Sequence, residues 1–330
     1  MATMRALTFD PKEGVVLKRN YPKPIRKSGE ALIRIIRAGI CSTDIEITKG
    51  YADFSGVLGH EFLGIVEEVD DNSSITQGQR VCGEINLPCN SCKICSVGGI
   101  QKRNHCPKRT VLGIVNKDGT FADYITLPVD NLYPVPVEIS DERAVFAEPL
   151  AAAFRIIEQG LINEDSVVAV IGDGKLGLLI AEVISIQKSK GLTVFGRHME
   201  KLKLLPQGIK TVLADKKIII PEDQYDVVVE ATGNPEGLKM AISMTRPMGV
   251  VVMKSSYAMG SEFNTFPIVV KEIQIIGSRC GNFQMALDAM KTNKICPKKL
   301  ITKCYSFEEA VDAMEHAMTK GTMKIQLEFD

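Results

Sequence analysis

One short stretch of the chain holds three side chains that together suit a catalytic metal ion. Cys41 supplies a thiol, His60 an imidazole and Glu61 a carboxylate. A thiolate and a neutral imidazole favour zinc, because calcium and magnesium prefer shells made of oxygen. Three protein ligands leave one zinc position open, which is typical of catalysis. Alone, Cys41 could be a buried thiol and His60 a core histidine. Gly39 and Gly59 precede them, as expected where backbone bends close to a bound group.

A second group of cysteines has the spacing of a closed metal site. Cys89, Cys92 and Cys95 follow a C-x2-C-x2-C pattern, and Cys106 comes after ten intervening residues. Four thiolates fill a tetrahedral zinc shell, so this site is predicted to be structural. His105 is the alternative fourth ligand. Unligated thiols are the competing interpretation, but at this spacing they are prone to oxidation. The remaining thiols are assigned to packing: Cys82, Cys280, Cys296 and Cys304.

A glycine-rich turn follows the apolar run Val167–Ile171 and precedes a helical pattern that ends near Gly191. Gly172 permits a tight turn, Gly174 lets the backbone approach a pyrophosphate, and Gly177 lets helix and strand pack closely. Free amides at the helix start then bind the phosphates. A glycine-rich turn without a ligand is the alternative. The residues predicted to contact a dinucleotide here are Gly172, Gly174, Lys175, Leu176 and Gly177.

The end of the next predicted strand, Thr193–Phe195, indicates which dinucleotide is preferred. About twenty residues after the glycine motif, an NAD enzyme normally places an acid that binds the ribose hydroxyls and repels a 2′-phosphate. This chain has Gly196 there, followed by Arg197, His198 and Lys201, with no evident acid. Arginine can grip a phosphate through two parallel bonds, so NADP is predicted in preference to NAD. Alternatively, Arg197 lies in solvent and backbone contacts bind NAD.

Two parts of the chain, with different sequence patterns, position these residues. Up to about Pro136, short β-rich runs broken by Gly, Pro, Asn and Asp predict a barrel-like lobe. From Asp165, runs of Val and Ile alternate with amphipathic helices, which is typical of a parallel sheet covered on both faces. The strands predicted in the first part are Arg5–Phe9, Ala31–Arg37, Leu63–Val69, Arg80–Glu84 and Phe121–Leu127. Those of the second part are Val167–Ile171, Thr193–Phe195, Val227–Glu230, Val250–Met253 and Ile273–Ile276, with a further candidate at Thr211–Leu213.

Ala231, Thr232 and Gly233 directly follow one of these strands, and ligands of doubly wound sheets lie at the carboxyl ends of the strands. These three residues are therefore predicted to contact the nucleotide. After the last strand of the sheet, a helix is expected from Phe283 to Thr292. A second helix opens with a capping box made by Ser306 and Glu309, and a final strand is expected at Lys324–Phe329.

Length, charge and cysteine content limit the possible functions. A chain of 330 residues is expected to form two domains. Its 40 basic and 40 acidic residues give no electrostatic footprint for nucleic acid or an anionic membrane. Nine cysteines, an odd number, argue against a secreted disulfide framework. No apolar run is long enough for a membrane span, and the first ten residues lack a signal-peptide core. The expected protein is cytoplasmic and acts on a small molecule.

The motifs GICSTD and VLGHEFLG resemble the catalytic zinc signature of the zinc-dependent medium-chain dehydrogenase/reductase family, which includes alcohol and polyol dehydrogenases. The resemblance extends over nearly the whole chain. It implies an α/β protein with a GroES-like β-rich catalytic domain and a Rossmann domain, a doubly wound parallel sheet that binds the nucleotide. The implied boundaries are 1–147 for the catalytic domain, 148–277 for the nucleotide-binding domain, and 278–330 for a return to the catalytic domain, with a cleft between them.

The resemblance also implies a role for each residue of the motifs. Cys41 and His60 would bind zinc, and Glu61 would be a ligand that exchanges with water. Asp44 would orient an imidazole ligand, and the hydroxyl of Thr43 would pass the substrate proton outward.

Three further positions bear on this resemblance. Glu46 stands where many relatives carry a histidine at the outer end of the proton relay. Glu148 resembles the third protein ligand of polyol and sugar dehydrogenases, although a carboxylate at a helix start beside Pro149 is the alternative. Arg279 resembles an arginine that lies between cofactor and substrate in polyol dehydrogenases, and the alternative is a plain surface arginine.

The predicted function is hydride transfer between an alcohol or polyol, or its carbonyl product, and a nicotinamide cofactor. One catalytic and one structural zinc are expected, with zinc polarising the substrate oxygen. Alternatives are a zinc-free enone or quinone reductase, which the combination of Cys41, His60 and Glu61 disfavours, and a non-catalytic nucleotide-binding protein on the same fold. The family suggests a homodimer or homotetramer.

Overall fold

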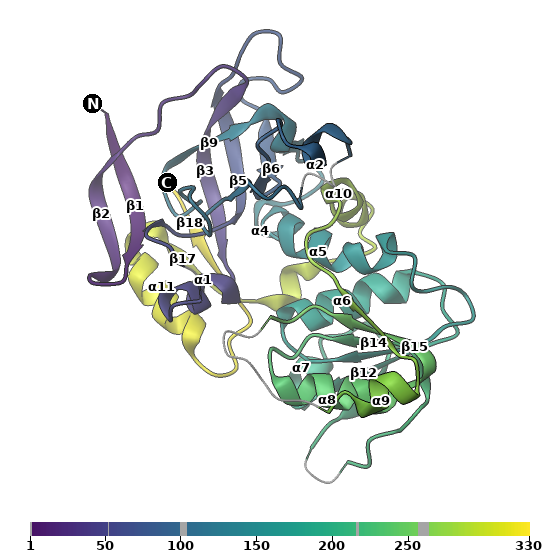
Figure 1. The fold of residues 1–330 in the computed structure, drawn as a ribbon. Coiled ribbons are helices and arrows are strands. Elements are labelled where there is room, and N and C mark those ends of the chain that lie inside the picture. The colour runs from purple at the N-terminus through teal and green to yellow at the C-terminus, as the bar shows by residue number, and fades with distance from the viewer. Residues whose placement is uncertain (1, 52, 100–103, 216–217, 257–263) are drawn as a thin grey trace. The chain divides into compact units, whose positions relative to one another are not determined.

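The computed structural model describes residues 2–51, 53–99, 104–215, 218–256 and 264–330, and the chain divides into two compact units (Figure 1). Unit 1 comprises Met1–Glu148 and Phe283–Asp330, and unit 2 comprises Pro149–Asn282. The sequence predicted divisions after residues 147 and 277. In the described ranges, no helix has both the length and the apolar run that crossing a bilayer requires.

Unit 1 is built around one long strand, β3 (Glu30–Ile40). Most of its residues are buried, and neighbouring strands pair along both of its edges. Strand β5 (Glu61–Glu68) and strand β9 (Tyr124–Pro128) pair with it antiparallel. So does β18 (Lys324–Glu328), the last strand of the chain, drawn in yellow in Figure 1. The two ends of the sequence therefore meet in one sheet.

The register of these pairings positions the candidate metal ligands. Gly39, near the end of β3, is opposite Glu61 on one side and Gln326 on the other. The chain then leaves β3 and enters the short helix α1 (Ser42–Thr48) through Cys41. The first residue of β5 and the residue after β3 are therefore neighbours.

Further strands and short helices complete unit 1. The predicted capping box of Ser306 and Glu309 is present, and it opens a 3₁₀ turn that continues as a helix. The strands are β1 (Thr3–Asp10), β2 (Gly14–Pro22), β4 (Gly56–Val57), β6 (Arg80–Gly83), β7 (Asn86–Leu87), β8 (Thr110–Val111), β10 (Leu132–Pro134) and β17 (Ile301–Ser306). The helices are α2 (Lys93–Ser96), η1 (Val129–Asn131), α4 (Asp141–Ala144), α10 (Phe283–Lys291), η2 (Pro297–Leu300), η3 (Phe307–Glu309) and α11 (Ala310–Met318).

Unit 2 contains the predicted parallel sheet, in the order β13-β12-β11-β14-β15-β16. Its strands read as continuous Val and Ile because helices cover them, and Val228 and Val251 are fully buried. The strands are β11 (Val167–Ile171), β12 (Gly191–Gly196), β13 (Lys210–Leu213), β14 (Tyr225–Glu230), β15 (Thr245–Met253) and β16 (Gln274–Gly277). The helices are α5 (Ala147–Glu158), which begins in unit 1, α6 (Lys175–Ile186), α7 (Met199–Leu202), α8 (Pro235–Met244) and α9 (Phe266–Val270).

Some details differ from the sequence predictions. Helix α6 ends at Ile186, because Gln187 is already extended and Gly191 begins the next strand. Strands β2 and β17 and helix α1 were not predicted. Strand β2 is half exposed and lacks a clean alternation, and α1 is too short for a helical period to be visible. Cys296 is exposed, so its assignment to packing was wrong, whereas Cys82 is buried as expected.

Candidate functional site

The carboxylate of Asp44 ties together the two segments that carry the candidate zinc ligands. Asp44 lies in the first turn of α1, where backbone amides favour an acid, and it is 0% exposed. Its Oδ2 accepts a 2.8 Å hydrogen bond from the Cys41 amide. Its Oδ1 accepts one of 3.2 Å from the Gly59 amide and lies 3.1 Å from His60 Nδ1. One buried group thus fixes both segments.

Cys41, His60 and Glu61 come together as a group that could hold a metal ion. One ligand atom of each residue lies within 4.8 Å of the others. Because Nδ1 of His60 faces Asp44, its Nε2 is left for a metal. Burial lowers the pKa of His60, but the Asp44 carboxylate and the Cys41 thiol raise it more, so it ends well above its ordinary value. Asp44 and Cys41 therefore favour a positive charge beside this ring, which a metal ion at Nε2 would supply.

Glu61 forms a buried ion pair with Lys324, a residue that the sequence analysis did not single out. The Lys324 ammonium contacts Glu61 Oε2, and each side chain is 1% exposed. Within the described residues, the buried Oε1 of Glu61 has no hydrogen-bond partner. Leaving a buried carboxylate oxygen unsatisfied is costly, and a cation held by Cys41 and His60 would satisfy it. The residues present therefore fit a zinc ion.

Glycines are required beside this group for steric reasons. A side chain at Gly39 would collide with Glu61 Oε2 and lie 2.8 Å from Val145 Cγ1. Gly59 has φ +94°, and a side chain there would stand 2.7 Å from Thr120 Oγ1. Both positions therefore accept only glycine without displacing the neighbours of the site.

The other predicted residues of this site lie around the group. Thr43 Oγ1 is 3.7 Å from Cys41 Sγ. Glu46 forms a 3.0 Å ion pair with Lys49 near the surface. Glu148 is not among the residues whose ligand atoms cluster within 4.8 Å. Burial chiefly raises the pKa of its carboxyl to about 7, while the nearby His60 lowers that pKa.

The four predicted structural cysteines form a second cluster. Their sulfur atoms lie within 4.8 Å of one another, and four of the separations are 3.4, 3.5, 3.7 and 4.0 Å. Thiolates about 2.3 Å from a tetrahedral zinc ion stand roughly 3.8 Å apart, so these sulfurs fit one ion. The members are Cys89, Cys92, Cys95 and Cys106.

Local contacts lower the pKa of the Cys89 and Cys92 thiols, whereas burial raises the pKa of the Cys95 thiol to about 12. The hydroxyl and the backbone amide of Ser91 lower the pKa of the Cys89 thiol to about 6, and thiolates are the metal-binding form. His105 is exposed and is not a member of the cluster, so Cys106 is the better fourth ligand. Residues 100–103 of the connecting segment lie outside the described residues.

In unit 2, the glycine motif forms a cradle at the start of α6. Gly172 has φ +123°, and a side chain there would stand 2.5 Å from the carbonyl oxygen of Ala231. A side chain at Gly177 would collide with the carbonyl oxygen of Gly172. At Gly174, which caps the helix before Lys175, a side chain would meet nothing within 4 Å. This open space in front of the first amides of the helix fits a dinucleotide pyrophosphate.

The other predicted nucleotide contacts lie at the carboxyl ends of strands. Thr232 donates from its amide and its hydroxyl to the buried carboxylate of Glu230, at 2.7 and 2.5 Å. The amide of Gly233 donates to Ser255 Oγ at 2.8 Å. The carbonyl of Arg279 accepts from Lys254 Nζ at 2.9 Å. These bonds fix the loops that follow β14, β15 and β16.

The end of β12 differs from the sequence prediction in one respect. The sequence analysis found no acid there, but Asp173 of the glycine motif places a buried carboxylate beside Gly196. This carboxylate accepts a 2.6 Å hydrogen bond from the His198 amide and lies 3.0 Å from His198 Nδ1. Arg197 is exposed, and Lys201 is half-buried.

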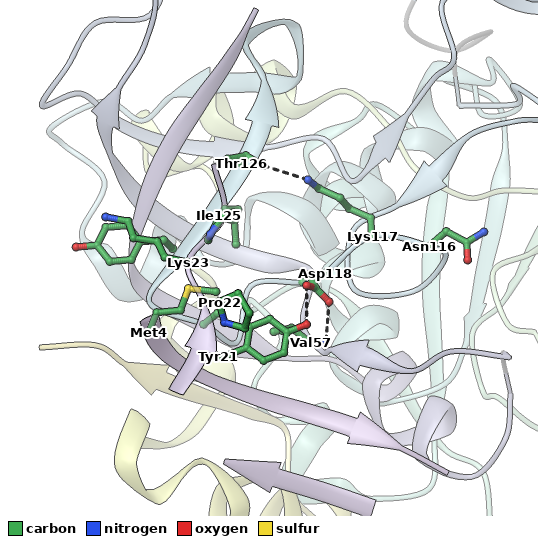
Figure 2. A pocket seen from close by; sticks show the side chains of 14 residues that line it. Met4, Tyr21, Pro22, Lys23, Val57, Asn116, Lys117, Asp118, Ile125 and Thr126 are labelled. Atoms are coloured by element: carbon green, nitrogen blue, oxygen red, sulfur yellow. Dashed lines mark hydrogen bonds between the residues drawn. The ribbon is translucent and has the colours of Figure 1, made fainter. Parts of the chain in front are cut away.

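A hollow of about 430 Å³ lies elsewhere in unit 1, and Figure 2 shows it from close by. Asp118 accepts hydrogen bonds of 2.9 Å from the Tyr21 hydroxyl and from the Val57 amide. Lys117 Nζ donates to Thr126 Oγ1 at 3.2 Å. No candidate metal ligand lines this hollow, so it is separate from the site described above.

Two families match the chain by sequence. Residues 27–137 match the alcohol dehydrogenase GroES-like domain, and residues 192–292 match the zinc-binding dehydrogenase family. The sorbitol dehydrogenase of Halalkalibacterium halodurans is 30% identical over 321 residues, which cover 91% of each protein.

Solved structures of similar fold extend over the same length. A zinc-binding dehydrogenase from Sinorhizobium meliloti bound to NADP is 26% identical, with a TM-score of 0.89 over 99% of this chain and 100% of that one. An alcohol dehydrogenase from Escherichia coli complexed with NADH is 27% identical, with a TM-score of 0.88 over 99% of both chains.

Replacing Asp44 should weaken metal binding without unfolding the chain. Asp44→Asn removes the charge that orients His60, and loss of such a partner typically lowers metal affinity about 10–100-fold. The measurement is competition for zinc against a chelator of known affinity. Asp118→Asn is the matched control, because Asp118 also accepts from a backbone amide but faces the separate hollow. Equal zinc retention in both variants would contradict the assigned role of Asp44.

The two metal groups predict two zinc ions per chain with different consequences. Cys41→Ala should lose one zinc and all turnover while the chain stays folded. Cys92→Ala should lose the other zinc and chiefly lower the free energy of unfolding, because a closed site contributes directly to folding. Elemental analysis and chemical denaturation measure both effects, with the exposed Cys296→Ala as control. A single zinc ion per wild-type chain would show that one of the two groups is not a zinc site.

Because Lys324 and Glu61 form a buried ion pair, we expect substitutions of the two residues to have strongly non-additive effects on the free energy of unfolding. In chelator-treated protein, Lys324→Met leaves the Glu61 carboxylate without its counter-ion and should lower the free energy of unfolding by about 3–5 kcal/mol. Combining Lys324→Met with Glu61→Gln should recover most of this loss, since the uncompensated charge is then absent. Urea denaturation of the two single variants and the double variant tests the cycle. Additive losses would show that the two side chains do not interact.

Proposed function

The chain belongs to the zinc-dependent alcohol and polyol dehydrogenases of the medium-chain family, and from this premise we propose that Cys41, His60 and Glu61 form its catalytic metal site. The enzyme transfers hydride between an alcohol or polyol, or its carbonyl product, and a nicotinamide cofactor. The observation that carries the proposal is the buried Asp44 carboxylate, which holds the Cys41 and His60 segments together beside the unsatisfied Oε1 of Glu61.

We assign a separate task to each unit. Unit 1, residues 1–148 and 283–330, carries both metal groups and is the catalytic domain. Unit 2, residues 149–282, carries the glycine cradle and is the nucleotide-binding domain. The open space at Gly174 and the strand-end loops around Thr232 and Arg279 support this assignment. The four-cysteine cluster is a structural zinc site, supported by its nearly tetrahedral sulfur separations.

The chain's own residues hold the reacting groups and move the proton. When bound, zinc polarises the substrate oxygen and the nicotinamide exchanges hydride with the substrate carbon. Asp44 accepts a hydrogen bond from Nδ1–H of His60, which keeps Nε2 free for the metal. The hydroxyl of Thr43 takes the substrate proton outward. Residue 46 is a glutamate paired with Lys49, where many relatives carry the histidine of the proton relay. The proton therefore leaves Thr43 toward the cofactor ribose and then solvent.

Glu148 completes the surroundings of the metal in this proposal, either directly or through a water molecule. Its support is that the half-buried Glu148 lies close enough to His60 and Glu61 for their charges to act on its carboxyl. Glu148→Gln is expected to lower both zinc occupancy and activity, and a variant that keeps both in full would exclude this role.

The remaining proposals concern partners and location. The nine free thiols fit a reducing compartment, so we place the enzyme in the cytoplasm. The substrate is a small molecule, and balanced charge gives no reason to expect nucleic acid. We expect a homodimer or homotetramer, as the family suggests.

For the cofactor, we propose that NADP is preferred over NAD. Gly196 supplies no acid from the strand itself, while the exposed Arg197 and the half-buried Lys201 offer cationic donors to a 2′-phosphate. Arginine suits this role because its planar group can bind phosphate through two bonds. The solved relatives include one bound to NADP and one complexed with NADH, so the fold accommodates either dinucleotide.

A substrate panel with both cofactors tests this proposal. Simple alcohols, polyols, sugars and carbonyls are assayed spectrophotometrically, and the expected result is zinc-dependent turnover with a higher kcat/KM for NADP. Arg197→Ala should reduce the NADP to NAD ratio about 10-fold, because it removes a charge-assisted bond to phosphate. The control is Arg246→Ala, an arginine at the amino end of β15 that pairs with Asp226. A wild-type ratio that favours NAD would overturn the preference, and no turnover on any substrate would overturn the function.

A further inference from the structure

The end of β12 carries a carboxylate that comes from a different part of the chain. Asp173, the second residue of the glycine motif, is 8% exposed. A side chain at Gly196 would place its Cβ 2.6 Å from Asp173 Cβ and 2.8 Å from Asp173 Oδ2. The same Cβ would also stand 2.8 Å from Leu202 Cδ2, so residue 196 has to be glycine as long as residue 173 carries a side chain.

The same geometry shows where the carboxylate lies. A side chain at position 196 would start at a Cβ that touches the volume Asp173 already fills, so Asp173 places its own carboxylate beside the end of β12. In NAD enzymes, the acid at this strand end binds the ribose hydroxyls and repels a 2′-phosphate. The chain therefore keeps a carboxylate at the strand end, although the strand itself supplies only glycine.

We propose that Asp173 is a specificity-determining residue, a carboxylate that binds the adenosine ribose and opposes the 2′-phosphate. This inference rests on the proposed nucleotide-binding function of unit 2. Arg197 and Lys201 favour NADP, Asp173 favours NAD, and the balance of the two allows both cofactors to bind. Asp173 thus limits the preference that the cationic residues create.

The contacts of Asp173 leave capacity for a ribose hydroxyl. Its Oδ2 accepts from the His198 amide at 2.6 Å and lies 3.0 Å from His198 Nδ1. Its Oδ1 has only the longer 3.2 Å contact to the same ring nitrogen among the described residues. A carboxylate oxygen offers two lone pairs, so Oδ1 can still accept from a hydroxyl. The bonds to His198 meanwhile hold the carboxylate in place and fix the turn that carries Arg197.

Binding of two nucleotide fragments tests the proposal without turnover. Isothermal calorimetry compares 5′-AMP with 2′,5′-ADP on the zinc-loaded wild type and on Asp173→Asn, which keeps an acceptor for the His198 amide. We expect Asp173→Asn to tighten 2′,5′-ADP relative to 5′-AMP about 10-fold, because one negative charge near the phosphate is lost. Glu164→Gln is the control, since this exposed acid precedes the amino end of β11, whereas Gly196 and Arg197 lie at the carboxyl end of β12.

The outcomes separate this inference from the function on which it rests. An unchanged ratio, or a loss of 2′,5′-ADP affinity in Asp173→Asn, would overturn the role of Asp173 while nucleotide binding stands. A wild type that binds neither fragment would overturn both.

Exchanging the two residues gives an independent check. Gly196→Asp alone should destabilise unit 2, because the new side chain collides with Asp173. Combined with Asp173→Gly, the same change returns a carboxylate to the strand and leaves only the flexible Leu202 Cδ2, 2.8 Å from the new Cβ, to adjust. Most of the lost stability and the wild-type fragment ratio should therefore recover. Two results would contradict the idea that a carboxylate from residue 173 or from residue 196 occupies the same place. One is a double variant as unstable as Gly196→Asp, and the other is a double variant with the nucleotide-fragment ratio of Asp173→Asn.

Discussion

The hydrogen bonds of Asp44 are the interaction on which the candidate active site depends. One buried carboxylate accepts from the backbone of the Cys41 segment and from the Gly59 amide, and it orients the ring of His60. Such a group is stable in the interior only when its partners are all present. The same hydrogen bonds that satisfy the Asp44 carboxylate also hold the segments of Cys41 and His60 in place. The site therefore assembles only when Asp44 has all of these partners.

The sheet of unit 1 supplies the second constraint. Strand β3 has β5 on one side and β18 on the other, so Glu61 and Lys324 meet although 263 positions separate them in the sequence. A register slip of one residue would turn Glu61 to the other face of the sheet. The buried ion pair requires the correct register, because either charge left alone in the interior is strongly unfavourable. The candidate metal group therefore forms only when β3, β5 and β18 have paired in this register.

Sequence patterns predicted the parts of the site that are local. The ligands of the zinc group and the glycine cradle lie within short motifs, and the strands of unit 2 show continuous runs of Val and Ile. Lys324 and Asp173 were missed for a physical reason. Their roles come from tertiary pairing: Lys324 contacts Glu61 only because β18 joins β3, and Asp173 reaches β12 only because Gly196 leaves it room. The spacing of residues within one segment cannot predict contacts between side chains from distant segments.

Anomalous scattering at the zinc absorption edge, from crystals of the purified chain, would locate the metal ions in the molecule. We expect two peaks in each chain. One should lie about 2.3 Å from Cys41 Sγ and about 2.0–2.1 Å from His60 Nε2, and the other should lie at the centre of the four cysteine sulfurs. A zinc-replete, active crystal with no peak beside Cys41 and His60 would contradict the account, because the residues that Asp44 holds together would then not be the metal site.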